Sequence, residues 1–312
     1  MIKKIKIGNT QIPNNIFCAP LAGYTDFAMR KICYKFGAGL CFTEMVSAKG
    51  LKYNNDATRA LLYKHESEPL TAAQIFGCDP EIMRSACESE DLKNFSTVDI
   101  NMGCPVPKVF KNGEGSALLE NIPLAEKIIS ECKKSGKNIT VKFRIGVTAQ
   151  KIVGVEFAKA CENAGADLIT VHGRTRDKYY SGDVDFIEIE KIKNAVKIPV
   201  IANGGIFSKS DAQNMIDKTG ADGVMIARAA LYNPHVFAQI VKDESEWDIR
   251  STIEEQIKDM LAFYGERFTV VQMRKMTSFY IKGMRNCAQY KNKLFSCNTI
   301  SELNEVINEI FN

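Results

Sequence analysis

The sequence predicts an α/β protein in which a (β/α)8 barrel, or TIM barrel, is followed by a small all-helical domain. Eight short runs rich in β-branched residues recur along the first 240 residues, and segments with helical patterns lie between them. The strand pattern ends there, and the charged stretch KDESEWDIR leads into segments with helical patterns only. We therefore expect a barrel at residues 1–240, a usual size for this fold, and a helical domain at residues 241–312.

The expected strands and helices follow one another in strict alternation. The segment DPEIMRSACESED has Asp79 as N-cap and Pro80 at the first helical position, and SKSDAQNMIDKTG runs from a Ser208 cap to Gly220. The competing α/β architecture, a doubly wound sheet, would need a Gly-x-Gly-x-x-Gly turn after the first strand, and none is present. The expected strands are Ile16–Pro20, Leu40–Glu44, Thr71–Phe76, Val98–Asn101, Ile139–Phe143, Leu168–His172, Pro199–Asn203 and Gly223–Ala227.

The composition is that of an ordinary globular protein, with 45% hydrophobic and 25% charged residues. No window holds the roughly 18 apolar residues that a membrane span needs. The N-terminal stretch MIKKIKIGNTQIPNN alternates Ile with Lys and turns at Gly8-Asn9, which predicts a hairpin in place of a signal peptide. We therefore expect a cytoplasmic protein that has no membrane contact. The net charge of +4 indicates no particular partner by itself.

Polar residues gather where the expected strands end. In a barrel the active site lies at the carboxyl ends of the strands. A barrel with a purely structural role has no reason to place so many polar side chains around one rim, so these positions predict a binding or catalytic site. The residues at the eight ends are Pro20, Glu44, Gln74, Asn101, Lys142, His172, Asn203 and the pair Ala227-Arg228.

The last two loops predict an anion site. In NGGI (Asn203–Ile206), glycines let backbone N–H groups approach a phosphate closely, and Arg228 in ARAAL adds a charged donor. No Walker loop is present, which disfavours a nucleoside triphosphate. No metal-ligand spacing occurs, and with three histidines we expect no metal site.

Two further features of the rim indicate a chemical role for its side chains. Lys142 and His172 end adjacent strands, with Arg174 just beyond, and could stabilise developing negative charge such as that of a reduced flavin ring. Lys142 could instead form an ion pair, with Glu44 as the candidate partner. In VDINMGCP, Cys104 follows a strand end directly, whereas most of the ten cysteines are expected to be buried, reduced thiols because no C-x-x-C pair occurs.

Several motifs resemble those of the tRNA-dihydrouridine synthase family, in order and spacing, and most closely its bacterial B-type branch. MRKMTSFYIKGM (Met273–Met284) is similar to the C-terminal R-K-H-x-x-W-Y-x-K-G signature of that family, so the resemblance covers nearly the whole chain. Met276 and Phe279 stand where the family often has His and Trp, which leaves open the nucleotide that is read. Leu21 for the commoner Met conserves volume and should be tolerated. The barrel motifs are APLAGYTD, AAQIFG, DINMGCP, VHGRT, ANGGI and MIARAAL.

The resemblance implies an FMN-dependent enzyme that reduces the C5=C6 bond of a uracil base in tRNA and uses NADPH as reductant. It implies that Cys104 is the general acid for C5, a role that suits a thiol because its ordinary pKa, ~8.5, keeps it protonated at neutral pH. Asn101, Arg174 and Tyr180 would face the uracil. The implied cofactor residues are Pro20, Leu21, Ala22, Gln74, Lys142 and His172 around the ring, and Asn203, Gly204, Gly205, Ala227 and Arg228 at the phosphate.

The tail carries a basic segment suited to RNA. From Arg267 to Lys293 there are seven basic residues and no acidic one. On a continuous helix Arg267, Arg274 and Lys282 would lie within about 80° of one another, which suits a phosphate backbone. The alternative is an ordinary solvated helix face. We expect Arg274, Lys275 and Lys282 to contact tRNA, with Phe268, Val271 and Phe279 as apolar anchors.

Two other functions stay open from the sequence. A flavin barrel that reduces a free pyrimidine or another small enone would use the same rim but would leave the basic tail without a role. An RNA-binding protein without catalysis would explain the tail but would need a damaged rim. For the preferred function we expect a monomer that binds tRNA and NADPH and needs no obligatory protein partner.

Overall fold

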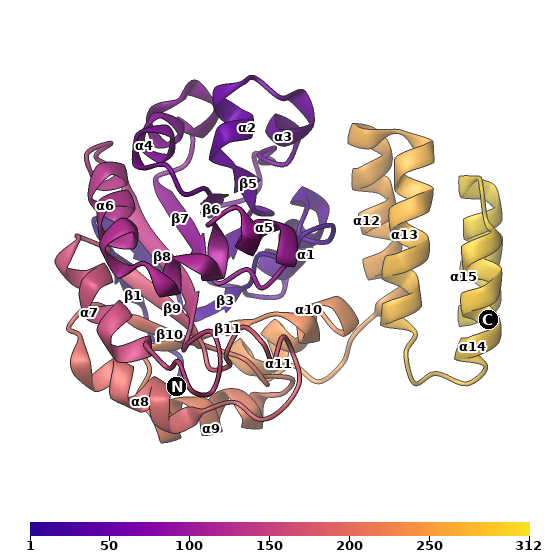
Figure 1. The fold of residues 1–312 in the computed structure, drawn as a ribbon. Helices are drawn as coiled ribbons and strands as arrows, with labels where there is room; N and C mark the ends of the chain where they lie inside the picture. The colour runs from indigo at the N-terminus through magenta and orange to yellow at the C-terminus, as the bar shows by residue number, and fades with distance from the viewer.

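The computed structural model describes residues 1–312 and contains the predicted closed barrel (Figure 1). Its eight parallel strands form one sheet that closes because β4 pairs with both β3 and β6, and β11 pairs with β3. The prediction of a (β/α)8 barrel is confirmed. The barrel strands are β3 (Ile16–Cys18), β4 (Leu40–Phe42), β6 (Thr71–Phe76), β7 (Thr97–Met102), β8 (Asn138–Arg144), β9 (Leu168–His172), β10 (Val200–Asn203) and β11 (Gly223–Ile226).

Two smaller strand features accompany the barrel. The predicted hairpin is present as β1 (Ile5–Ile7) and β2 (Thr10–Ile12), and it lies under the amino ends of the strands, where Asn138 Nδ2 donates to Thr10 Oγ1 at 2.9 Å. Its isoleucines join a buried cluster with side chains from the barrel interior. The strand β5 (Val46–Ser47), which pairs with β6, was not predicted because two residues show no periodicity.

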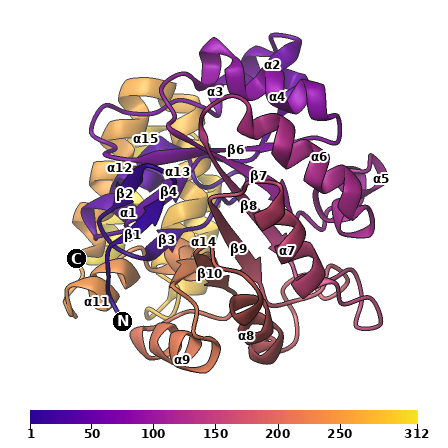
Figure 2. The same ribbon diagram turned by 90° about the vertical axis from the view of Figure 1, so that its left-hand side faces the viewer.

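Helices surround the strands on the outside, as Figure 2 shows for α6 to α9. The predicted caps are confirmed: Asp79 accepts hydrogen bonds from two N–H groups at the start of α4, Ser208 caps α9, and α9 ends at Gly220 with a φ of 64°. The long outer helices are α1 (Phe27–Lys35), α4 (Pro80–Glu88), α6 (Ile122–Lys133), α7 (Gly154–Asn163), α8 (Phe186–Ala195) and α9 (Lys209–Thr219). The shorter ones are α2 (Ala48–Lys52), α3 (Asp56–Ala60), α5 (Pro107–Lys111), α10 (Arg228–Tyr232) and α11 (Val236–Val241).

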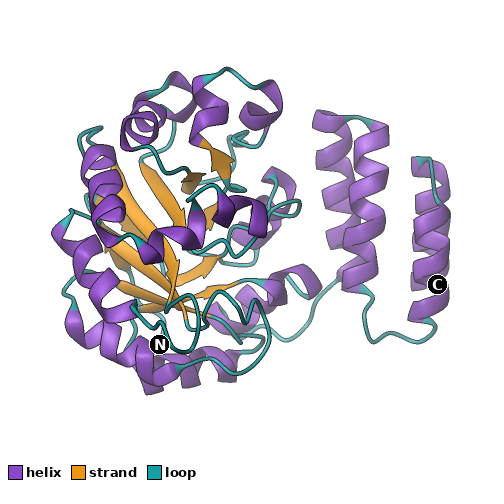
Figure 3. Cartoon of the chain, in the orientation of Figure 1, coloured by secondary structure: helices purple, strands orange, loops and turns teal.

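The C-terminal helices stand beside the barrel (Figure 3). They are α12 (Ile249–Tyr264), α13 (Glu266–Tyr280), α14 (Cys287–Ser296) and α15 (Ile300–Phe311). Helix α12 lies against α1, where Lys31 and Asp259 form an ion pair at 2.7 Å. Met29 of α1 shares one buried apolar cluster with Met273 and Tyr280 of α13, so the helices are fixed against the barrel. No helix has both the length and the apolar character needed to span a bilayer.

The predicted continuous basic helix through Lys282 is wrong. Helix α13 ends at Tyr280, and Gly283, with a φ of 92°, turns the chain away, so Lys282 lies in the following loop. Of the expected anchors, Phe268 and Val271 are exposed, and only Phe279 is half-buried.

The cysteines are all free thiols. Eight of the ten are buried, and Cys78 and Cys287 are half-buried, as expected for a reduced protein.

Candidate active site

The carboxyl ends of the barrel strands surround a cavity of about 300 Å³. All the residues predicted to act on cofactor or uracil line this one cavity, whereas Arg274, Lys275 and Lys282 lie outside it in the C-terminal segment. The sequence therefore predicted a set of side chains that the fold brings together. They are Pro20, Leu21, Ala22, Gln74, Asn101, Cys104, Lys142, His172, Arg174, Tyr180, Asn203, Gly204, Gly205, Ala227 and Arg228.

A chain of hydrogen bonds crosses the floor of the cavity. Asp99 and Asn101 lie two residues apart on β7, so both point into the barrel. Gln74 of β6 pairs in register with Asp99, and its Nε2 donates to Asp99 Oδ2 at 2.6 Å. Asn101 Nδ2 in turn donates to Gln74 Oε1 at 2.9 Å. The floor is thus a connected polar layer in which each amide has a fixed orientation.

Cys104 sits at the end of this layer. Asn101 Oδ1 accepts the N–H of Cys104 at 2.9 Å, and the carbonyl of Cys104 accepts the Ser116 hydroxyl at 2.7 Å. Gly115, with a φ of 60°, passes so close that a Cβ there would lie 3.0 Å from Cys104 Cβ. Burial raises the pKa of the Cys104 thiol above its ordinary value, against the opposing charges of Arg144 and Lys142. The thiol is therefore protonated at neutral pH and can donate a proton.

The walls carry several cationic groups. Burial, and then the charge of Arg144, lowers the pKa of Lys142 to about 8. Burial and four surrounding cations hold the pKa of His172 well below its ordinary value, so its imidazole is neutral. Arg174 NH1 lies 3.3 Å from His172 Nε2, which must therefore accept. This excess of positive charge suits an anionic ligand.

The alternative ion pair between Lys142 and Glu44 is wrong. Glu44 does not line the cavity; its carboxylate accepts the N–H of Gly23 and feels the charge of Lys275. The carboxylate whose charge acts on Lys142 is that of Asp99.

The loops after β10 and β11, where the sequence predicted an anion site, lie together at one end of the cavity. Gly204 and Gly205 have φ values of 120° and 68°, and their N–H groups donate to no backbone carbonyl of the protein. A Cβ on Gly204 would lie only 3.0 Å from the His172 ring and would be strained at this φ, so glycine is favoured there. Arg228 stands over the Tyr180 ring at 5.1 Å. Two free N–H groups and a guanidinium at one end of a cavity suit a phosphate group.

Comparison with known proteins identifies the family. A family model described as dihydrouridine synthase matches residues 17–312. This chain belongs to the dihydrouridine synthase family. The tRNA-dihydrouridine synthase B of Pasteurella multocida is 35% identical over 291 residues, which cover 90% of this chain and 88% of that protein. A probable tRNA-dihydrouridine synthase of Helicobacter pylori is 37% identical, with 95% and 92% covered.

Comparison with solved structures shows a shared fold and no more. A TcOYE solved with pHBA superposes with a TM-score of 0.59 at 10% identity, covering 77% of this chain and 92% of that one. A variant of NCR from Zymomonas mobilis gives 0.57 at 17% identity, with 80% and 93% covered. The resemblance stated from the motifs is therefore confirmed, and family membership makes the chain an oxidoreductase.

One cavity residue of this dihydrouridine synthase family member escaped the sequence analysis although a signal was present. Arg144 follows Lys142 by two residues on β8, so strand alternation turns both side chains to the cavity. Its Nε donates to the carbonyl of Gly103 and its NH1 to that of Tyr179, both at 2.9 Å. Arg144 thus ties the Cys104 loop to the loop that carries Tyr180. Phe207, which is 49% exposed at the cavity mouth, was also not predicted, because no pattern in the sequence marks it.

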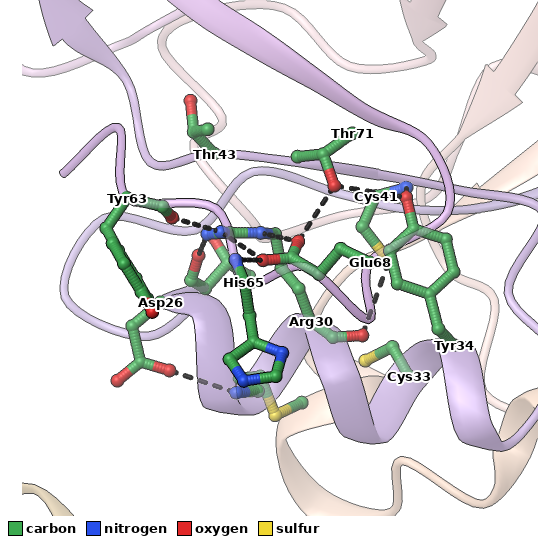
Figure 4. A network of polar contacts seen from close by, with 12 residues as sticks. Asp26, Arg30, Cys33, Tyr34, Cys41, Thr43, Tyr63, His65, Glu68 and Thr71 are labelled. Carbon is green, nitrogen blue, oxygen red and sulfur yellow. Dashed lines mark hydrogen bonds and ion pairs between the residues drawn. The ribbon is translucent and has the colours of Figure 1, made fainter. Parts of the chain in front are cut away.

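A buried ion pair supports the first cavity loop (Figure 4). Arg30 of α1 donates from Nε and NH2 to the two carboxylate oxygens of Glu68 at 2.7 and 2.9 Å, and both side chains are fully buried. NH1 of Arg30 donates to the carbonyl of Thr25 at 2.8 Å, and the Thr25 hydroxyl accepts the N–H of Leu21. The pair therefore fixes the loop whose Leu21 and Ala22 line the cavity.

Proposed function

We propose that this protein is an FMN-dependent tRNA-dihydrouridine synthase that reduces the C5=C6 bond of uridine in tRNA with NADPH as reductant. The supporting observation is that the protonated Cys104 thiol and the anion cradle of Gly204, Gly205 and Arg228 share one cavity. The names of the relatives in Pasteurella multocida and Helicobacter pylori agree with this substrate. Because tRNA is the proposed substrate, we propose a cytoplasmic protein; a monomer with no obligatory protein partner stays the prediction from the sequence.

The cavity residues would divide the binding of FMN among them. Pro20, Leu21 and Ala22 would lie along the ring, Gln74 and Lys142 would hydrogen-bond it, and neutral His172 would lie beside it. The phosphate would be held by Gly204, Gly205 and Arg228, with Ala227 beside them. Asn203, whose Nδ2 donates to the carbonyl of Met225 at 2.8 Å, would fix the start of the glycine loop. When bound, the flavin supplies the hydride that reaches C6 of the uracil.

The protein would supply the proton and hold the base. Cys104 would break its S–H bond as the C5–H bond forms, and the resulting thiolate would regain a proton from water. Lys142 would stabilise the negative charge of the reduced flavin ring that it contacts. Asn101, Arg174 and Tyr180 would orient the base.

The phosphate assignment predicts a selective effect of Arg228→Ala. Loss of a charge-assisted hydrogen bond costs about 1.5–3 kcal/mol, so FMN should bind about 10–100-fold more weakly. Riboflavin, which lacks the phosphate, should bind the variant and the wild type alike. Titration of the apoprotein followed by flavin fluorescence measures both; an equal loss for the two flavins would contradict the assignment.

The helical segment beyond residue 240 would bind the tRNA while a uracil is taken out of the stack into the cavity. Two of the predicted contacts already have partners within the protein. Arg274 NH1 donates to the carbonyl of Cys297 at 2.8 Å, and Lys275 Nζ donates to that of Gly23 at 2.8 Å. Lys282 is exposed and stands over the Tyr232 ring at 4.4 Å, so it is the contact most available to phosphate.

Lys282→Gln should weaken tRNA binding and lower the slope of log K against log salt by about 1, the effect of one lost phosphate contact. Lys293→Gln is the matched control, because Lys293 belongs to the same basic segment but already pairs with Glu309. Binding of an unmodified tRNA transcript at several salt concentrations measures both slopes. If the slope for Lys282→Gln equalled that of wild type, Lys282 would not be a phosphate contact of the tRNA.

A further inference from the structure

Asp99 lies beneath the cavity, does not line it, and has no assigned role in the proposed reaction. It is 0% exposed, and its two oxygens accept from Gln74 Nε2 at 2.6 Å and from the Thr140 hydroxyl at 2.5 Å. Burial raises its pKa to about 6, so it carries a charge at neutral pH. Burying a charged carboxylate costs free energy, so the presence of Asp99 at this position needs a functional explanation.

A chain of hydrogen bonds leads from Asp99 through Gln74 and Asn101 to Cys104, and in it each residue donates to the one before. An ionised carboxylate only accepts, so Gln74 must turn its Nε2 to Asp99 and its Oε1 to Asn101. Asn101 then presents Nδ2 to Gln74 and Oδ1 to the backbone, where it accepts the N–H of Gly103 at 3.2 Å and of Cys104 at 2.9 Å. The backbone N–H groups only donate, so both ends of the chain demand the same orientation of the two amides.

We propose that Asp99 is a positioning residue for the proton-transfer step, which acts through Gln74 and Asn101 to hold the Cys104 loop and the uracil-facing amide in place. This inference rests on the proposed function. Gln74 and Asn101 are themselves buried, so an amide that lost its acceptor would leave an unpaired donor and would be free to rotate. A shift of the donor by about 1 Å is enough to slow a reaction by about 10²-fold.

The competing explanation is that Asp99 serves as a counter-charge for Lys142, whose pKa it raises. The two explanations differ in what they require of the side chain. The directional role needs only an acceptor facing Gln74, whereas the counter-charge role needs the negative charge.

Two substitutions at position 99 separate the roles. In Asp99→Asn the side-chain oxygen can still accept from Gln74, and its amide N–H can donate to the Thr140 hydroxyl, which can rotate to accept. Asp99→Leu has similar volume but no acceptor. Gln74→Met breaks the chain one link further on and leaves Asp99 intact, so it serves if Asp99→Leu does not fold.

The first readout is hydrogen exchange at the amides of Gly103 and Cys104, which needs neither cofactor nor turnover. We expect exchange at these two amides to be about tenfold or more faster in Asp99→Leu and Gln74→Met, and within about threefold of wild type in Asp99→Asn. Amides paired within the barrel strands serve as the internal control for general loosening. Wild-type exchange in Asp99→Leu, or acceleration spread evenly over the barrel, would overturn the inference.

The second readout separates the two half-reactions of the FMN-loaded protein. Reoxidation by tRNA should slow by about 10–100-fold in Asp99→Leu, a larger loss than any in flavin reduction by NADPH, the step that Gln74 affects through its contact with the ring. Asp99→Asn should keep most of the wild-type reoxidation rate. A loss as large as that in Asp99→Leu would show that the negative charge of Asp99 is the required property, and would overturn the directional role. If wild type itself formed no dihydrouridine, the proposed function would fail, and the exchange measurement would still decide whether Asp99 holds the Cys104 loop.

Discussion

Cys104→Ala is expected to slow uridine reduction by about 10²-fold or more, the usual contribution of a general acid. Flavin reduction by NADPH should continue at close to the wild-type rate, because that step takes no proton from Cys104. The reason is local: burial keeps the thiol protonated, and Asn101 together with Ser116 holds the residue that carries it. Rapid mixing of the NADPH-reduced protein with unmodified tRNA measures the affected step alone.

Cys78→Ala is the matched control for that experiment. Cys78 is a half-buried thiol whose Sγ lies 3.4 Å from the carbonyl of Asn112, and it does not line the cavity. Its loss should leave both half-reactions unchanged. Full activity of Cys104→Ala would refute the assignment of the proton donor, and an equal loss in Cys78→Ala would show that the effect is not specific to the cavity.

Glu68→Gln is expected to lower the free energy of unfolding by about 3–5 kcal/mol, because it removes the carboxylate that pairs directly with the fully buried Arg30. The same change loosens the loop at Leu21, so FMN binding should also weaken. Denaturant unfolding of the apoprotein isolates the stability effect. Glu88→Gln serves as the control, because Glu88 pairs with Arg84 on the exposed surface, where such a pair contributes little to stability. A loss below about 1 kcal/mol in Glu68→Gln would contradict this account of the buried pair.

The sequence predicted the barrel and its rim because both depend on local patterns. Strand alternation and helix caps mark the strands and helices, and the fold rule then brings the strand ends to one place. The same alternation, applied to β8, would also have predicted Arg144 beside Lys142.

Other features depend on contacts between distant segments and left no local signal. Arg30 and Glu68 are 38 residues apart, and nothing in either neighbourhood predicts that they form a buried pair. The strand predicted to end at Glu44 ends at Phe42, so Glu44 lies two residues beyond β4, and its carboxylate accepts the N–H of Gly23. The sequence predicted one basic surface because the basic residues of the tail lie in one stretch of sequence. The chain turns after Tyr280, however, and Arg274 and Lys275 donate to carbonyls of the protein itself.

The contact of Lys275 with Gly23 also connects the C-terminal helices to the barrel. Lys275 of α13 donates to Gly23, in the same loop as Leu21 and Ala22 of the cavity. Tyr24 of that loop contacts Phe279 of α13, with 5.8 Å between ring centroids. The helix expected to meet RNA is therefore attached to a wall of the proposed flavin site.

The most direct test of the proposed function is an anaerobic experiment in two steps. The FMN-loaded protein is bleached with NADPH, and the reduced protein is then mixed with unmodified tRNA transcript or, separately, with free uridine. We predict that the visible flavin band returns with tRNA, that one dihydrouridine forms for each flavin reoxidised, and that free uridine restores the band far more slowly. A protein that binds no FMN, or one reoxidised as fast by free uridine as by tRNA, would contradict a tRNA-dihydrouridine synthase.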